Sequence, residues 1–256
     1  MAAGEMGVRM RFYTIDNIRG INLISMILYH LVWDMVYIFG ISLEWYESEA
    51  GYLWQQSICW TFIFLSGFCW TLGKQHFKRG CIVSLAGAAI SVITILIMPE
   101  QRIVFGVLSM LGACMLLMIP LDKAVRKWNK YAGLLMSVVL FFFVREINEG
   151  FFGFESMRVG RVPSAFYKGY MMTFLGFPDE SFQSTDYFSL FPWFFLFLAG
   201  YFAFQIVSEH EKNTFLQGKK MSGISYVGKY SLPIYMLHQP IIYGALFVGT
   251  QLSCAF

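Results

Sequence analysis

His30 and Asp34 are the residues whose types and spacing are best suited to chemistry. They lie four positions apart in the apolar stretch Ile21–Ile41, so on a helix they share one face, one turn from each other. Arg19 precedes His30 by eleven positions and falls near the same angle. Ionisable groups inside a bilayer are costly and usually face a bundle interior or a water-filled cavity. The stripe therefore predicts a catalytic site in which His30 accepts a proton and Asp34 orients the ring or stabilises its charged form.

A second histidine, His238, lies at a similar predicted depth in the segment SLPIYMLHQPIIYG. Pro240 removes a backbone donor and disturbs the turn before it. Opened backbone at membrane depth is tolerated only where protein or a cavity covers it. We predict that His30, Asp34 and His238 share one catalytic site and that Gln239 binds substrate there. The alternative is that these side chains only form hydrogen bonds between helices.

Three further residues carry functional predictions with a structural alternative each. Asp186 begins an apolar segment and is assigned to substrate binding or to a helix cap. Trp193, which follows Pro192, is assigned to substrate contact or to packing in the interfacial aromatic belt. Arg19 either pairs with Asp16 or holds an anionic group such as the phosphate of a cofactor.

The composition indicates a membrane protein. Hydrophobic residues make up 57% of the chain and charged residues 14%, with a mean hydropathy of +0.56, whereas a soluble domain has about 25% charged residues. There is no basic block typical of a nucleic-acid surface, so no nucleic-acid partner is expected. The five cysteines show no metal-ligand spacing, so we expect free thiols and no metal.

Seven hydrophobic segments approach the length of about 20 residues that spans a bilayer. They predict an all-α fold, a polytopic transmembrane helical bundle forming a single domain over residues 1–256. The segments are 20–41, 52–73, 81–98, 103–121, 131–145, 187–207 and 229–250. The first is interpreted as an uncleaved helix, because it is longer than the apolar core of a signal peptide and contains His and Asp.

The placement of basic residues predicts that the N-terminus is cytoplasmic. With that orientation, 14 of the 19 lysines and arginines lie on the cytoplasmic side. Six of them form a group that either meets the phosphates of a cytosolic cofactor or, the favoured interpretation, only reflects the positive-inside rule. These six are Lys74, Lys78, Arg79, Lys123, Arg126 and Lys127. The long loop 146–186 is then on the outer side, and its short apolar patch 164–176 is predicted to be interfacial or re-entrant.

At these residues the chain resembles a known family. DNIRGINLISMILYHLVWD resembles the first transmembrane segment of multipass acyltransferases of the heparan-α-glucosaminide N-acetyltransferase catalytic-domain type. The arginine–histidine pair Arg19 and His30 is also shared with integral-membrane sugar O-acyltransferases. FIFLSGFCW, DYFSLFPWFFLFLAGYF and SLPIYMLHQPIIYG resemble later segments of bacterial members, so the likeness runs from about Arg11 to Tyr243.

The resemblance implies acetyl transfer from cytosolic acetyl-CoA to a sugar amine or hydroxyl on the other side of the membrane. His30 is then the catalytic histidine, and Arg19 is its motif partner and a contact for the cofactor. The sequence lacks the large lumenal domain and several spans of the lysosomal enzyme, so an envelope glycan or a small glycoside is expected rather than heparan. The implied partners are the lipid bilayer, an acyl-CoA and a carbohydrate acceptor, in a bacterial plasma membrane; formation of a homo-oligomer is left open.

A second function class fits the same residues. A proton-coupled transporter or flippase component would use His30, Asp34 and His238 as a proton relay. Many transporters are built from internal repeats, and the sequence shows none, which favours the enzyme.

Overall fold

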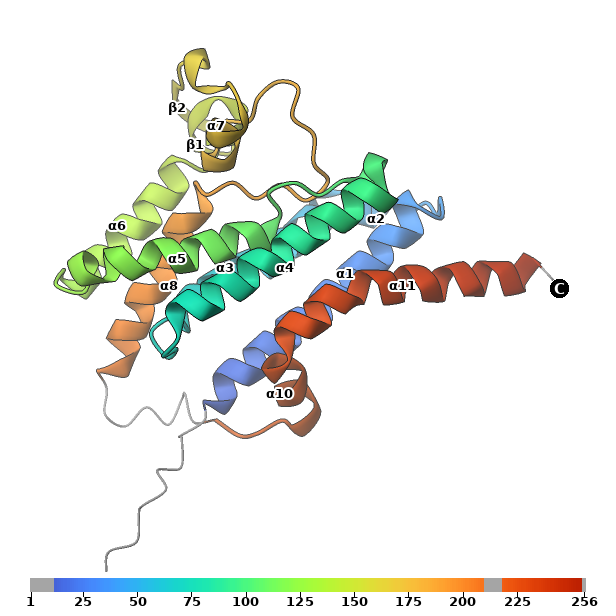
Figure 1. Cartoon of the computed structure of the whole chain (residues 1–256), viewed down its shortest axis with the longest axis horizontal. Helices are drawn as coiled ribbons and strands as arrows, with labels where there is room; N and C mark the ends of the chain where they lie inside the picture. The colour runs from blue at the N-terminus through green and yellow to red at the C-terminus, as the bar shows by residue number, and fades with distance from the viewer. Residues whose placement is uncertain (1–11, 210–217, 255–256) are drawn as a thin grey trace, which may run out of the picture. The chain divides into compact units, whose positions relative to one another are not determined.

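The computed structural model describes residues 12–209 and 218–254 of the chain (Figure 1). It is mostly helical, with 71% helix and ten helices among the described residues, which confirms the helical class that the sequence predicts. The chain divides into two compact units. The first combines Met1–Cys59 with His210–Phe256, and the second is Trp60–Glu209.

The first unit is built on the close contact of α1 (Tyr13–Tyr37) with α10 (Ser222–Lys229). Two glycines permit this contact. A Cβ atom on Gly20 would lie 2.1 Å from the Ile224 carbonyl oxygen, and one on Gly228 would lie 1.9 Å from the Asp16 carbonyl oxygen. Small residues let two helix backbones approach in this way. The last helix of the chain, α11 (Ser231–Cys254), also packs against α1.

The first turns of α3 (Glu49–Phe68) complete the first unit, after the short α2 (Glu44–Glu47). Asn22 of α1 donates a hydrogen bond of 3.1 Å to the Ile58 carbonyl, and the Trp54 indole donates one of 2.8 Å to the Ser25 hydroxyl. Both bonds satisfy polar groups that would otherwise be left unpaired between helices. The buried core beside them consists of Leu23, Met26 and Ile58.

The second unit contains the remainder of α3 and the helices of the middle of the chain. A Cβ atom on Gly67 of α3 would lie 1.8 Å from the Phe197 carbonyl oxygen, and one on Gly200 would lie 2.0 Å from that of Phe64, so α3 and α8 are also in backbone contact. The helices of this unit are α4 (His76–Ile97), α5 (Val107–Val125), α6 (Lys130–Phe143), α7 (Tyr170–Leu175) and α8 (Trp193–Ser208).

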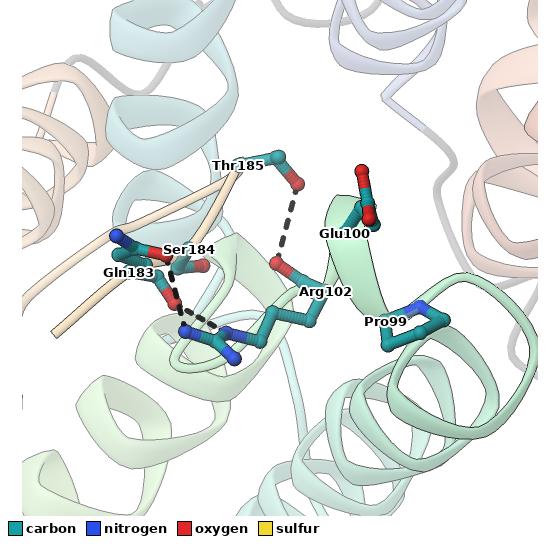
Figure 2. A pocket seen from close by; sticks show the side chains of 6 residues that line it. All are labelled: Pro99, Glu100, Arg102, Gln183, Ser184 and Thr185. Atoms are coloured by element: carbon teal, nitrogen blue, oxygen red, sulfur yellow. Dashed lines mark hydrogen bonds between the residues drawn. The ribbon is translucent and has the colours of Figure 1, made fainter.

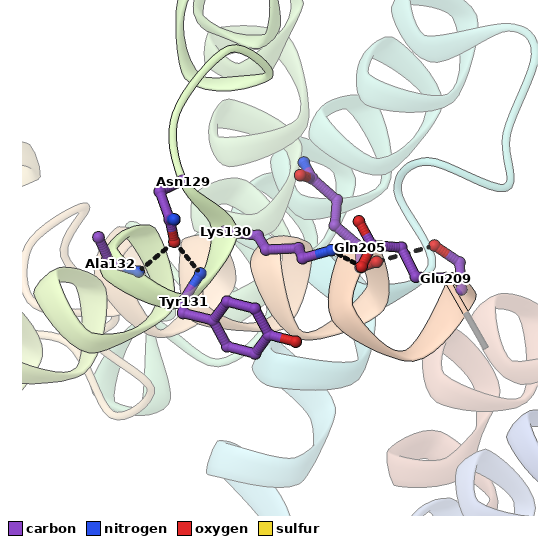
Figure 3. A network of polar contacts seen from close by, with 7 residues as sticks. Asn129, Lys130, Tyr131, Ala132, Gln205 and Glu209 are labelled. Carbon is purple, nitrogen blue, oxygen red and sulfur yellow. Dashed lines mark hydrogen bonds and ion pairs between the residues drawn. The ribbon is translucent and has the colours of Figure 1, made fainter.

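Polar contacts fix how α6 and α8 run relative to each other (Figure 3). The Asn129 side chain accepts hydrogen bonds from the backbone N–H groups of Tyr131 and Ala132, at 3.0 and 3.2 Å, and so caps the start of α6. Lys130, the first residue of α6, forms an ion pair with Glu209 at the end of α8. The start of one helix therefore lies beside the end of the other, and the pair is antiparallel.

The long loop 146–186 contains a small antiparallel hairpin, which the all-α prediction did not include. Phe151–Phe154 forms β1 and Met157–Arg161 forms β2, with an irregularity between Phe152 and Gly153. Strands of four and five residues are too short to give a clear alternating pattern, and this irregularity shifts the register inside the hairpin.

The rest of this loop has little regular structure. Two single 3-10 turns lie at Ile147–Glu149 and Ser164–Phe166. The apolar patch that follows forms α7, which has only six residues and is too short to span a bilayer. A third 3-10 turn, Pro99–Gln101, lies in the separate connection between α4 and α5.

Each of the seven predicted hydrophobic segments contains a helix, but their boundaries and apolar character differ. Among the described residues, five helices are long and apolar enough to cross a membrane: Tyr13–Tyr37, His76–Ile97, Val107–Val125, Lys130–Glu149 and Ser231–Gln251. The other two segments correspond to α3, whose first half carries polar side chains, and to α8, which has 16 residues. The count of seven spans and the cytoplasmic N-terminus stay predictions.

Candidate active site

In the first unit, α1 and α11 bring two histidines into contact. The ring centroids of His30 and His238 are 4.8 Å apart, and their planes meet at 58°. Both rings lie well inside their helices, away from the ends of α1 and α11. Two titratable rings from the opening and closing helices of the chain therefore occupy one place in the fold.

The hydrogen bond of His238 fixes its tautomer. Its Nδ1 atom lies 2.5 Å from the Tyr235 carbonyl oxygen. A carbonyl oxygen only accepts, so Nδ1 carries the proton and Nε2 of the neutral ring carries the lone pair. This Nε2 atom is buried and has no hydrogen-bond partner among the described residues. It is a proton acceptor held in a fixed orientation.

Asp34 and Gln239 join the same two helices. Asp34 is 0% exposed, and its Oδ1 atom accepts a hydrogen bond of 2.6 Å from Nε2 of Gln239. Because the Gln239 amide donates through its nitrogen, its Oε1 atom takes no part in this bond and stays available as an acceptor. Asp34 Oδ2 and Gln239 Oε1 are both buried without a partner in the described part of the chain.

The structure shows no hydrogen bond between Asp34 and His30 among the described residues, and the prediction that Asp34 stabilises the charged ring stays a prediction. The hydrogen bond of Asp34 goes to Gln239, 205 positions away, rather than along its own helix. This contact ties α1 to α11, as the alternative of an interhelical bond described. Three acceptors of the same two helices are buried without a partner in the described part of the chain: Asp34 Oδ2, His238 Nε2 and Gln239 Oε1. Buried acceptors are normally satisfied, so this set suits a ligand rich in donors, such as an amine or a polyol.

An aromatic wall lies next to the histidines and was not predicted. Tyr29 meets the Trp54 ring at 5.3 Å and the Tyr46 ring at 5.2 Å between centroids. His30 packs edge-on to Tyr29 at 5.8 Å. Burial, and then its neighbour Tyr29, raises the pKa of Tyr46, so this phenol keeps its proton and donates to the Tyr29 carbonyl at 3.5 Å. The sequence signal for this wall was the aromatic content of the loop after α1 and of the segment that follows it.

Arg19 is half-buried on α1 and forms no ion pair or hydrogen bond with any residue in the described ranges 12–209 and 218–254. The predicted pairing with Asp16 is therefore not present. Eleven residues of helix separate Arg19 from His30, a distance of about 16 Å along the axis. The structure accordingly does not bring Arg19 into contact with the histidine pair.

A model for the family described as heparan-alpha-glucosaminide N-acetyltransferase, catalytic, matches residues 11–240. The chain belongs to this family. Its members are acetyltransferases, and the apolar helices of this chain agree with a multi-pass membrane protein of that kind. Comparisons with curated proteins and with solved structures give no significant match.

In this member of the N-acetyltransferase family, the predicted substrate contacts Asp186 and Trp193 belong to the second unit. Asp186 Oδ2 accepts a hydrogen bond of 3.4 Å from the Val107 N–H at the start of α5. Burial raises the pKa of Asp186 to about 6. Asp186 thus acts as a cap, the structural alternative of the sequence analysis, but for α5 rather than for the helix that follows it. Trp193 is buried, and the Arg145 guanidinium lies 4.9 Å from its ring centre.

The loop that holds Asp186 also lines an open polar pocket of about 560 Å³ (Figure 2). Arg102 donates to the Gln183 carbonyl at 3.2 Å and to its side-chain oxygen at 3.3 Å, and the Thr185 hydroxyl donates to the Arg102 carbonyl at 3.3 Å. These contacts join the α4–α5 connection to the loop before α8. The polar atoms shown in the pocket are largely used in holding the two loops together.

Metal ligands are sparse in the described part of the chain. No group of three or more His, Cys, Asp or Glu side chains there is arranged to hold a metal ion. Cys59, Cys69, Cys81 and Cys114 are not joined in disulfide bonds. The side chain of Cys254 lies outside the described residues.

Proposed function

We propose that the chain is a membrane-embedded acyltransferase that moves an acetyl group from acetyl-CoA to a sugar amine or hydroxyl of an envelope glycan or a small glycoside. The observation that carries this proposal is the contact of His30 with His238, whose Nε2 atom is one of three buried acceptors of α1 and α11 that lack a partner among the described residues. The family supplies the reaction class, since its enzymes transfer acetyl groups.

His30 is proposed as the general base. The acceptor nitrogen or oxygen attacks the thioester carbonyl carbon while the imidazole removes its proton. The new C–N or C–O bond forms, the C–S bond breaks, and the leaving thiolate takes the proton back from the imidazolium. The products are the acetylated sugar and free coenzyme A, so atoms and charges balance. A covalent route through an acetyl-imidazole on His30 uses the same residue.

The neighbouring side chains are proposed to position the acceptor. With its proton on Nδ1, His238 presents a lone pair at Nε2, so it receives a hydrogen bond from the attacking group rather than polarising the thioester carbonyl. Asp34 and Gln239 hold each other and offer one further acceptor each. The assignment of Asp186 and Trp193 to substrate binding, made from the sequence, stays a prediction.

Arg19 is proposed to hold the anionic part of the donor. A guanidinium matches the geometry of phosphate, and Arg19 has no competing partner in the described part of the chain. Coenzyme A carries its phosphates far from its thioester, which suits the separation of about 16 Å between Arg19 and His30 on a straight helix. With the N-terminus in the cytoplasm, this end of α1 faces the compartment that contains acetyl-CoA, as expected for a plasma-membrane enzyme.

The test is an assay of the purified full chain with radiolabelled acetyl-CoA and a panel of hexosamines. We expect acetylated sugar and free coenzyme A in equal amounts. His30→Ala should lower kcat by about 10²–10⁴-fold, the usual contribution of a general base, with an unchanged melting temperature. Leu28→Ala is the matched control, since Leu28 is an exposed residue of the same helix. An unchanged rate in His30→Ala would remove His30 from the mechanism.

A proton relay through a transporter also requires titratable rings in contact. Reconstituted vesicles separate the two functions. Sugar flux across the membrane without consumption of acetyl-CoA would contradict the acyltransferase and support the transporter. Product formation that depends on His30, with no such flux, supports the enzyme.

A further inference from the structure

The second unit contains a separate pocket, lined by both polar and apolar side chains, that the proposed reaction does not use. Its volume is about 240 Å³, and it lies where the turn between α3 and α4 meets the C-terminal ends of α5 and α8. The residues of its lining that bear on a ligand are Trp70, Thr71, His76, Asp122, Arg126 and Tyr201.

The acidic group of this pocket is already neutralised. Asp122 is buried, accepts a hydrogen bond of 2.5 Å from the Tyr201 hydroxyl, and forms an ion pair with Arg126 one helical turn away. The Arg126 side chain is 71% exposed, so only part of its guanidinium is occupied by this pair. A guanidinium has five N–H donors, and those not facing Asp122 are available to a ligand in the pocket.

An aromatic pair forms another wall. The His76 ring stacks on the Trp70 ring, with 4.0 Å between centroids and 20° between planes. The Trp70 indole donates to the Met115 carbonyl at 3.2 Å, which holds the pair in place. The neighbouring Thr71 hydroxyl is buried and has no partner among the described residues. A hydroxyl and an imidazole N–H are donors for an oxygen-rich anion.

The pocket also lies at the start of a long helix. α4 begins at His76 and has no side-chain cap, so N–H groups of its first turn carry the positive end of the helix dipole. The Arg79 guanidinium lies beside the connection that precedes α4, because a Cβ atom on Gly73 would lie 2.1 Å from one of its nitrogens. The first turn of α4 therefore adds positive potential to that of Arg126 around a cavity large enough for a phosphate group.

We propose that this pocket binds a phosphate group, carried either by a soluble nucleotide such as coenzyme A or by the headgroup of an anionic phospholipid. Arg126 and His76 contact the phosphate oxygens, the Thr71 hydroxyl donates to them, and the N-terminus of α4 completes the site. Only the coenzyme A source rests on the proposed function. The positive-inside rule explains why basic residues occur here, but it does not explain a pocket that gathers them with a buried hydroxyl.

The experiment measures binding to the purified full chain. Coenzyme A is titrated by calorimetry, and melting temperatures are compared in nanodiscs of phosphatidylglycerol and phosphatidylcholine. Arg126→Gln and His76→Phe test the pocket, and the phenyl ring of the latter keeps the stack on Trp70. Lys127→Gln is the matched control, because it removes one positive charge at the next position, outside the lining described above.

We expect Arg126→Gln and His76→Phe to weaken the binding of one probe at least tenfold, the loss of one charge-assisted contact, and Lys127→Gln to change it less than twofold. Weaker binding of coenzyme A by Arg126→Gln, in which Arg19 is intact, identifies the soluble source. Loss in Arg126→Gln of the stabilisation by phosphatidylglycerol alone identifies the lipid. Equal binding of both probes by Arg126→Gln and Lys127→Gln would overturn the proposal that the pocket binds phosphate. His30→Ala should bind both probes as the wild type does, so loss of transfer in that variant leaves this inference untouched.

Discussion

At the scale of single residues, the unusual property of this chain is a set of acceptors without donors. Asp34 Oδ2, His238 Nε2 and Gln239 Oε1 are all buried, and each lacks a partner in the described residues. An unsatisfied buried polar atom costs about 1–3 kcal/mol, so the fold carries a sizeable penalty here in the absence of ligand. A ligand that donates to one of these atoms would recover part of this free energy, which ties substrate binding to a local weakness of the fold.

Asp34→Asn separates the structural role of this residue from its proposed role in binding. The Asn side chain can still accept the hydrogen bond from Gln239 through its oxygen, while its amide nitrogen replaces the unpartnered acceptor Oδ2. We expect kcat/KM for sugar acetylation to fall at least tenfold, the loss of a charge-assisted contact of about 1.5–3 kcal/mol. The melting temperature should stay close to that of the wild type.

Asp34→Leu is the companion variant, because it removes both acceptors and leaves the Gln239 amide without its partner. We expect it to lower the melting temperature as well as the rate. Equal melting temperatures for Asp34→Leu and Asp34→Asn would contradict the structural part of this argument, and full activity of Asp34→Asn would contradict the functional part.

The sequence predicted part of this site for clear physical reasons. A helix rises 1.5 Å per residue, so the position of a residue in its segment gives its depth in the membrane. By this measure His30 and His238 were expected at a similar depth. The partner of Asp34 was not predicted, because it depends on which side chain of a neighbouring helix offers a donor. For the same reason, the Tyr201–Asp122 hydrogen bond of the second unit was missed, although Arg126 had been noted.

At the scale of elements, glycine contacts decide how closely helices approach. Gly228→Ala places a methyl group 1.9 Å from the Asp16 carbonyl oxygen, where only a shift of α10 away from α1 relieves the clash. We expect a loss of about 1–3 kcal/mol in the free energy of unfolding. Gly223→Ala on the same helix is the control, since its new methyl group meets nothing within 4 Å. It should be neutral or stabilising by up to about 1 kcal/mol. Unfolding in denaturant measures both, and equal effects would contradict the proposed contact.

The cap of α5 makes stability depend on pH. Burial raises the pKa of Asp186 from its ordinary 3.8 to about 6 in the folded chain, so the folded state holds this proton more tightly than the unfolded state. The resulting stability is fully present below pH 3.8 and is lost as the pH rises through about 6. We expect the melting temperature of the wild type to fall relative to Asp186→Asn between pH 4 and 7. A constant difference over this range would contradict the raised pKa.

The sequence predicted the long helices, which have long apolar runs, but not the short secondary-structure elements. Long apolar runs identified the membrane-length helices, although α1 begins at Tyr13 rather than near residue 20. The polar residues at its start do not end the helix, because the contact with α10 supports them. The hairpin Phe151–Arg161 was missed because its pairing depends on contacts between two very short strands rather than on a periodic sequence.

At the scale of the whole molecule, we propose that the two units form one membrane domain. Helix α3 supports this proposal, because the boundary between the units falls at Cys59 and Trp60, inside one continuous helix. A helix shared in this way makes each unit dependent on the other for part of its packing. A single cooperative unfolding transition is the behaviour expected of such a chain.

The number of spans is decided by α3 and α8. At 1.5 Å per residue, the 20 residues of α3 reach about 30 Å, the thickness of the hydrocarbon core, whereas the 16 residues of α8 reach about 24 Å. A short span can be accommodated by local thinning of the bilayer. We therefore expect both to cross, giving seven spans with the N-terminus in the cytoplasm. A fusion at the C-terminus cannot test this, because five and seven spans place that end on the same side.

Single cysteines on either side of each helix give the answer, introduced into a cysteine-free background and treated with a membrane-impermeant reagent. Glu47 and Lys74 flank α3, Glu180 and Lys219 flank α8, and all four side chains are exposed. With seven spans, Glu47→Cys and Glu180→Cys react in intact cells, whereas Lys74→Cys and Lys219→Cys react only after permeabilisation. If α3 lies on the surface instead, Lys74→Cys becomes reactive from outside. Reaction of Glu47→Cys only after permeabilisation would reverse the orientation and remove Arg19 from the side that contains acetyl-CoA.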